Sequence, residues 1–174
     1  MTKEKLLEKI KQKIVLTKEE ELEIFNLPPE DIKNLLLKYT SYSYLHDEAE
    51  LKIFDLPTEI AREILIGYVQ KYNLCTEAEL KIFDLPLEIA QEILLKYIKE
   101  HYLSAKVELK IFDMPIQNVE KILQKYMRRY ALHSKDAEEK ILALPTKTAK
   151  KLVRMYNKIC DKEKEIARNM SYMS

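Results

Sequence analysis

Apolar residues recur along this chain with two periods, a short helical one and a long one of 29 residues. Between residues 57 and 72, Ala61, Ile64, Leu65 and Tyr68 are spaced three or four apart. This spacing places them on one face of an α-helix. The same stripe returns one period later as Ala90, Ile93, Leu94 and Tyr97. The pattern therefore predicts a series of similar amphipathic helices.

The long period is marked by the five-residue sequence Ile-Phe-Asp-Leu-Pro. It is complete at residues 53–57 and 82–86, and altered at 24–28, 111–115 and 141–145. Successive copies begin 29, 29, 29 and 30 residues apart. Such regular spacing predicts a tandem repeat of one supersecondary unit. We divide the chain into five repeat units: 17–45, 46–74, 75–103, 104–132 and 133–159.

Each repeat unit is predicted to be a helical hairpin. In unit 46–74 we expect a short helix over residues 47–54 and a longer one over 57–72, with Pro57 setting φ in the first turn. Asp55 is expected to cap the longer helix by accepting a hydrogen bond from the Thr58 amide. In the short helix we expect Ala49, Leu51, Ile53 and Phe54 to face inward and Glu48, Glu50 and Lys52 to face solvent.

The two ends of the chain are predicted to cap the array. Residues 1–16 carry Leu6 and Ile10 at helical spacing in a charged segment, which is typical of an N-terminal capping helix. Thr17 and Glu20 match a capping box at the next helix start. Residues 160–174 predict a C-terminal helix with a frayed tail. The expected fold is all-α, an α-solenoid of five tandem hairpins of about 29 residues, each dependent on its neighbours for stability.

Composition supports the expected all-α fold and also predicts the cellular compartment. The chain has one glycine, no tryptophan and many good helix formers. It has no long apolar run and begins with a charged segment, so we expect a cytoplasmic protein without a membrane span. Cys75 and Cys160 occupy non-equivalent repeat positions and are expected to be free thiols.

Charge is distributed unevenly along the chain. Residues 1–15 sum to +3, each of the blocks 16–45, 46–74 and 75–103 to −3, residues 104–132 to +3 and residues 133–174 to +4. The basic end offers a candidate face for an anionic partner, either nucleic acid or an acidic protein, with a solvated surface as the simpler interpretation. Its residues are Lys121, Lys125, Arg128, Arg129, Lys151, Arg154 and Lys158.

A second candidate surface is apolar. Leu37, Ile66 and Leu95 follow the repeat proline by nine residues in the three acidic units and lie roughly 140° from the main stripe. They predict either a row that binds a protein partner or a second copy, or helices packed on two sides. Tyr44 and Tyr102 complete this candidate partner-binding set.

A further set of tyrosines recurs eleven residues after each repeat proline. These tyrosines lie within the apolar stripe, so we expect them in the core with their hydroxyls reaching a neighbouring repeat unit. Stacking of nucleic-acid bases is the alternative. The set is Tyr39, Tyr68, Tyr97, Tyr126 and Tyr156.

The sequence offers little for catalysis. Gly67 is the only glycine, so a glycine-rich phosphate loop is excluded. His46, Cys75 and His133 share one repeat position, but Thr17 and Ser104 fill it elsewhere, which is typical of a helix start rather than a metal site. We therefore expect no enzyme activity, no cofactor and no metal.

Residues 56–65, Leu-Pro-Thr-Glu-Ile-Ala-Arg-Glu-Ile-Leu, resemble the opening of an F-box over about ten residues of each unit. Membership of that family would imply binding to a ubiquitin-ligase adaptor. A Leu-Pro helix start followed by an apolar stripe is the alternative explanation, and we assign no family. The function expected from the sequence is a non-enzymatic scaffold for a protein partner, with nucleic-acid binding by the basic C-terminal units as the alternative.

Overall fold

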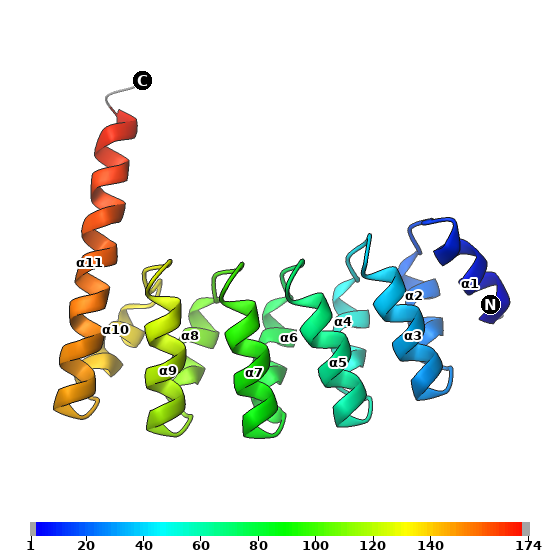
Figure 1. Ribbon diagram of the computed structural model, residues 1–174, viewed down its shortest axis with the longest axis horizontal. Helices are drawn as coiled ribbons and strands as arrows, with labels where there is room; N and C mark the ends of the chain where they lie inside the picture. The colour runs from blue at the N-terminus through cyan, green and yellow to red at the C-terminus, as the bar shows by residue number, and fades with distance from the viewer. Residues whose placement is uncertain (1–2, 172–174) are drawn as a thin grey trace. The chain divides into compact units, whose positions relative to one another are not determined.

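The computed structural model describes residues 3–171, apart from the side chains of residues 163 and 166–171. This described chain forms eleven α-helices and one short 3₁₀ helix and contains no strand (Figure 1). The prediction of an all-α protein is therefore confirmed. The chain divides into two compact parts, a first part ending at Glu100 and a second part beginning at His101.

Short and long helices alternate along both parts. The first part contains α1 (Lys3–Lys11), α2 (Lys18–Ile24), α3 (Pro29–Tyr39), α4 (Asp47–Ile53), α5 (Thr58–Tyr68), α6 (Thr76–Lys81), the 3₁₀ helix η1 (Ile82–Asp84) and α7 (Leu87–Tyr97). The second part contains α8 (Ala105–Ile111), α9 (Ile116–Tyr126), α10 (Lys135–Leu142) and α11 (Thr146–Ser171). Each repeat unit thus contributes one short and one long helix.

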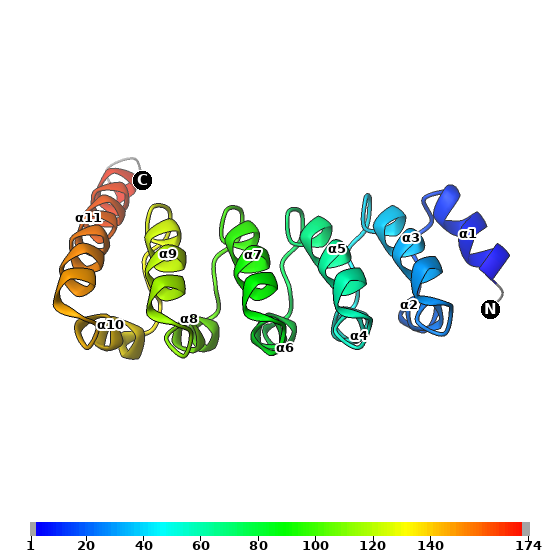
Figure 2. The ribbon, with the colours of Figure 1, turned by 60° about the horizontal axis from the view of Figure 1, so that its bottom comes forward.

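The first part has two layers. The long helices α3, α5 and α7 pack side by side, and the short helices α2, α4 and α6 form a second layer against them (Figure 2). The predicted stripe lies between the layers, where Ala61, Ile64, Leu65 and Tyr68 are completely buried. Helix α1 packs against α2 and α3 and buries Leu6 and Ile10.

In the second part α8 packs against α10, and α9 and α10 pack against α11. Helix α11 has 26 residues, whereas α9 has 11. It passes through residue 160 without a break, so the C-terminal helix predicted from residue 160 continues the long helix of the last repeat unit. The end of the predicted tail, residues 172–174, lies outside the described residues.

The helix boundaries confirm one predicted cap and correct another. The Thr17 and Glu20 capping box is present. Pro57 is the N-cap residue of α5 and no side chain caps this helix, so the cap predicted for Asp55 is wrong. The Asp55 carboxylate instead accepts a hydrogen bond from Lys52 Nζ at 3.2 Å.

The long helix of unit 46–74 ends at Tyr68 rather than at the predicted Tyr72. The amides of Lys71 and Tyr72 both donate to the Tyr68 carbonyl at 3.0 Å, which closes a turn after the helix. This turn returns the chain toward the short-helix layer.

The inward face of the short helix also differs from the prediction. Ala49 and Ile53 are buried as expected, but Leu51 and Phe54 are only half-buried, and Glu50 is 3% exposed. Positions 49, 50 and 53 share one helical face, because neighbours in space are three or four residues apart. The prediction that Glu50 faces solvent is therefore wrong.

Among the described helices, none is both long enough and apolar enough to cross a membrane.

Candidate functional site

The central polar feature of the first four repeat units is a buried glutamate bonded to a buried tyrosine. In unit 46–74 the Tyr68 hydroxyl donates to Glu50 Oε1 at 2.7 Å and accepts from the Leu45 amide at 3.1 Å. Glu50 Oε2 accepts from the Cys75 amide at 2.7 Å. Leu45 closes the preceding unit and Cys75 opens the next. This Glu–Tyr link therefore ties three successive units together through their backbone.

The Glu–Tyr link recurs at the same positions of the other units. Tyrosine donates to glutamate at 3.0 Å for Tyr39 and Glu21, 2.7 Å for Tyr97 and Glu79, and 3.1 Å for Tyr126 and Glu108, and also joins Tyr156 to Glu138. The hydroxyls accept from the amides of Leu16, Leu74 and Leu103 at 3.1, 3.4 and 3.2 Å. The prediction that these tyrosines lie in the core and reach a neighbouring unit is confirmed for Tyr68, Tyr97 and Tyr126. Tyr39 is buried and its hydroxyl reaches Leu16 of the N-terminal segment, whereas Tyr156 is only half-buried.

The residue that opens a unit bonds to the glutamate through its backbone. The His46 amide donates to Glu21 Oε2 at 2.8 Å, and the His133 amide donates to Glu108 Oε2 at 2.9 Å. Both rings also lie near the carboxylate, with Nδ1 to oxygen distances of 3.0 and 3.1 Å. Because the backbone amide makes this bond, the position accommodates both His and Cys.

The environment of the links keeps the phenols neutral. Burial raises the pKa of Tyr39 to about 12 and also raises the pKa values of Tyr68, Tyr97 and Tyr126. Burial likewise raises the pKa of Glu50, while hydrogen bonds from the Cys75 amide and the Tyr68 hydroxyl act in the opposite direction. The tyrosines thus act as donors to carboxylates, and the arrangement serves to join repeat units.

The sequence contained a signal for the buried glutamates that we did not use. Glutamate occupies the same repeat position in all five units, eighteen residues before the recurring tyrosine. The residues are Glu21, Glu50, Glu79, Glu108 and Glu138. An acidic side chain that never varies within the repeat indicates a fixed partner better than it indicates a solvated surface.

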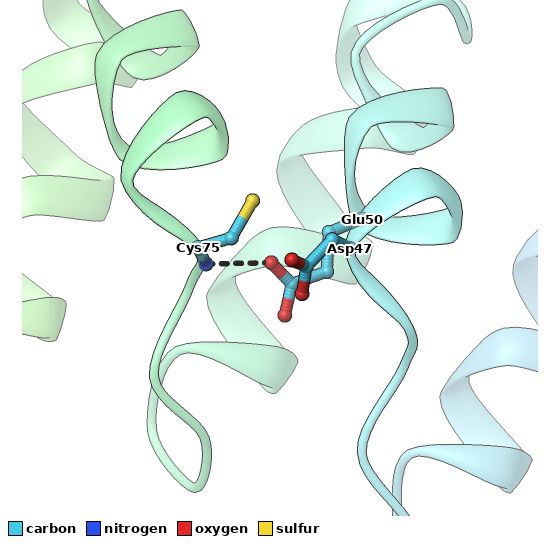
Figure 3. Close-up of side chains that lie close together, drawn as sticks. All are labelled: Asp47, Glu50 and Cys75. Atoms are coloured by element: carbon cyan, nitrogen blue, oxygen red, sulfur yellow. Dashed lines mark hydrogen bonds between the residues drawn. The ribbon is translucent and has the colours of Figure 1, made fainter.

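One group of side chains in the described residues has metal-ligand character. Donor atoms of Asp47, Glu50 and Cys75 all lie within 4.8 Å of one another (Figure 3). Carboxylate and thiolate are zinc ligands. Burial, however, raises the Cys75 pKa to about 11, so the neutral thiol predominates near pH 7. Both Glu50 oxygens also accept hydrogen bonds, which assigns this carboxylate to the Glu–Tyr link.

The predicted apolar row lies near the C-terminal ends of α3, α5 and α7. Leu37 is 37% exposed, and Ile66 and Leu95 are half-buried. A Cβ placed on Gly67 would lie 3.5 Å from Leu37 Cδ2, so Leu37 packs against α5. Part of this row is therefore used between neighbouring helices.

The two predicted partner-binding tyrosines are the more exposed members of the set. Tyr44 is 63% exposed in the first part and Tyr102 is 60% exposed in the second. Both lie in the loop that precedes a short helix.

The predicted basic residues all belong to the second part. Lys121 and Lys125 lie on α9, Arg128 and Arg129 follow it, and Lys151, Arg154 and Lys158 lie on α11. Lys151 forms an ion pair with Glu120 at 3.0 Å. From Thr146 to Cys160, α11 contains no acidic residue and carries five exposed cations, which we call the α11 basic stripe. They are Lys147, Lys150, Lys151, Arg154 and Lys158.

A groove in the first part was not foreseen. It has a volume of about 580 Å³ and lies between α2 and α4, with Leu22, Phe25 and Leu56 as its apolar lining. We call it the α2–α4 groove. Its polar lining residues are Glu19, Glu23, Asn26, Lys52 and Asp55. The equivalent apolar residues of the following units, Leu51, Phe54, Leu80, Phe83 and Leu85, are also half-buried.

Comparison of the chain with models of protein families, with curated proteins and with solved structures finds no match. The interpretation of these surfaces therefore depends on their own chemistry.

Proposed function

We propose that the protein is a small α-solenoid that acts as a non-enzymatic scaffold for a protein partner in the cytoplasm. Within each part the hairpins pack in sequence order, and the Glu–Tyr links join successive hairpins there. The recurring polar side chains are then used for assembly, and partner recognition falls to the side chains that remain on the surface.

The observation that carries this proposal is the repeated apolar surface of the short-helix layer. Leucine and phenylalanine recur there in half-buried positions, which we call the short-helix face: Leu22, Phe25, Leu51, Phe54, Leu80 and Phe83. Half-buried aromatic and aliphatic side chains in a groove are typical anchor points of protein interfaces. The exposed Asp55 and Asp84 at the helix ends add acidic groups that favour a basic partner.

Affinity capture from an extract of the source cells tests the proposal. The bait variants are wild type, Leu51→Glu on the short-helix face and Ile66→Glu on the predicted row of α3, α5 and α7. Thermal unfolding followed by circular dichroism establishes that each variant folds. We expect Leu51→Glu to lose the partner that wild type retains. Equal capture by all three baits would refute partner binding at both surfaces. Loss of the partner with Ile66→Glu alone would place the binding site on the long helices.

Nucleic-acid binding by the basic C-terminal units is the second candidate, favoured by the α11 basic stripe. A salt titration of binding to random oligonucleotides separates the two candidates, because phosphate contacts weaken steeply as salt concentration rises. Binding that falls steeply with salt and is lost in Lys150→Glu with Arg154→Glu would favour this second candidate.

A further inference from the structure

The two halves of the chain carry opposite charge. Residues 1–103 sum to −6 and residues 104–174 to +7. Oppositely charged surfaces on two copies of the chain attract one another. The attraction is strongest at low salt, because dissolved ions screen charges only over distances longer than about a Debye length.

On the acidic side, the α2–α4 groove combines charge with apolar lining. Glu19, Glu23 and Asp55 outnumber the single cation, Lys52, and Lys52 already bonds to Asp55 at 3.2 Å. Leu22 and Phe25 add apolar lining to the same groove. A basic helix with apolar flanks matches both properties.

On the basic side, the α11 basic stripe occupies one face of its helix. Positions 147, 150, 151, 154 and 158 fall within about 100° on a helical wheel. The buried residues Leu152 and Ile159 lie on another face, so the stripe points away from the core.

The stripe also opposes the usual distribution of charge at a helix start. The first turns of α3, α5 and α7 contain acidic residues, which interact favourably with the helix dipole. The first turn of α11 contains none and carries Lys147 instead. Helix α9 also lacks an acidic residue in its first turn but has no cation there, so Lys147 is unfavourably placed with respect to the helix dipole.

We propose that the α2–α4 groove of one copy binds the α11 basic stripe of a second copy, which joins molecules head to tail. This inference rests on the proposed function in treating the groove as a docking site, and it names the occupant. A groove of this size holds only a few side chains, so the contact is weak and depends on salt and concentration.

The test uses the full chain and sedimentation velocity over about 10 to 300 µM, a range suited to weak association. In 50 mM NaCl, wild type is expected to self-associate, and 500 mM NaCl should weaken this association about tenfold or more. A wild-type protein that stays monomeric throughout the range overturns the proposal. If that monomer binds random oligonucleotides through Lys150 and Arg154, the stripe belongs to nucleic-acid binding instead.

Charge reversal identifies the two surfaces. One variant combines Glu19→Lys with Asp55→Lys, and the other combines Lys150→Glu with Arg154→Glu. Each alone should associate much more weakly than wild type, because the first variant makes the groove basic like the stripe and the second lowers the charge of the stripe from +5 to +1. An equimolar mixture should associate again, because the unchanged stripe of the groove variant meets the unchanged groove of the stripe variant. Mixing that fails to restore association overturns the pairing.

A matched control separates docking from net charge. Glu59→Lys with Glu88→Lys changes two exposed residues on α5 and α7 and gives the same net charge as the groove variant. This control should self-associate like wild type. Loss of its association would refute binding at the α2–α4 groove. Capture from cell extract with Leu51→Glu is an independent measurement. A partner can be captured when the chain does not self-associate, and the chain can self-associate when no partner is captured.

Discussion

Replacing Tyr68 with phenylalanine isolates the contribution of one Glu–Tyr link. The ring remains and packing is preserved, while the hydroxyl that connects the Leu45 amide to Glu50 is removed. Tyr68 is completely buried, Leu45 is 2% exposed and Glu50 is 3% exposed, so water cannot easily replace the lost bonds.

The expected cost follows from the two groups left behind. A buried amide without an acceptor costs about 1 to 3 kcal/mol, and a lost hydrogen bond to a charged group costs about 1.5 to 3 kcal/mol. The two terms share one hydroxyl and do not add fully, so we expect Tyr68→Phe to lower the free energy of unfolding by about 2 to 4 kcal/mol.

Urea unfolding followed by circular dichroism at neutral pH measures this change. Tyr44→Phe is the matched control, because Tyr44 is 63% exposed and its substitution should change stability by about 0.5 kcal/mol or less. The reasoning is refuted if Tyr68→Phe and Tyr44→Phe unfold at the same urea concentration as wild type.

Three further predictions concern the same fold. The folded-state pKa of Tyr39 is raised from 10.0 to about 12, so the stability linked to it is present below pH 10 and lost as pH rises toward 12. Tyr39 alone contributes a loss of about 1.4 kcal/mol per pH unit, and the other buried tyrosines, Tyr68, Tyr97 and Tyr126, add to it. Unfolding titrations from pH 8 to 12 should therefore show at least this slope, and a flat profile would contradict it. Gly67→Ala should raise the free energy of unfolding by about 0.5 to 1 kcal/mol, because alanine favours helix and the added Cβ meets Leu37 at an ordinary contact distance of 3.5 Å. A melting temperature below that of wild type would argue against this packing. A peptide of residues 46–74 should be largely unfolded by circular dichroism, because it lacks the Leu45 and Cys75 amides that complete its link; a cooperative melt would show that one unit suffices.

The sequence was a good guide wherever the helical period alone decides burial. The stripe of Ala61, Ile64, Leu65 and Tyr68 is buried as its spacing predicts, and the Thr17 capping box forms as its two residues predict. The capping box depends on contacts within one turn, and the spacing of the stripe alone places its four residues on one helical face.

It was a poor guide where a polar group finds its partner in a neighbouring unit. Glu50 looked solvent-facing because acidic residues are rarely buried without a partner, and its partners lie eighteen and twenty-five residues away. Leu51 and Phe54 looked inward because they are large and apolar, although their helical face looks toward solvent. The α2–α4 groove was missed for the same reason, since it is formed between two helices that are distant in the sequence.

The links between units also constrain how such a chain can change in length. Because the carboxylates of Glu21, Glu50 and Glu108 each accept from the first amide of the following unit, a gain or loss of 29 residues would restore these bonds, whereas a single inserted residue would shift one donor out of place. The extra residue near His133 illustrates the exception: Glu108 there accepts from both His133 and Ser134 amides, at 2.9 and 3.0 Å. We infer that duplication and deletion of whole hairpins are the changes this architecture tolerates, and that smaller insertions survive only where a second amide can occupy the same carboxylate.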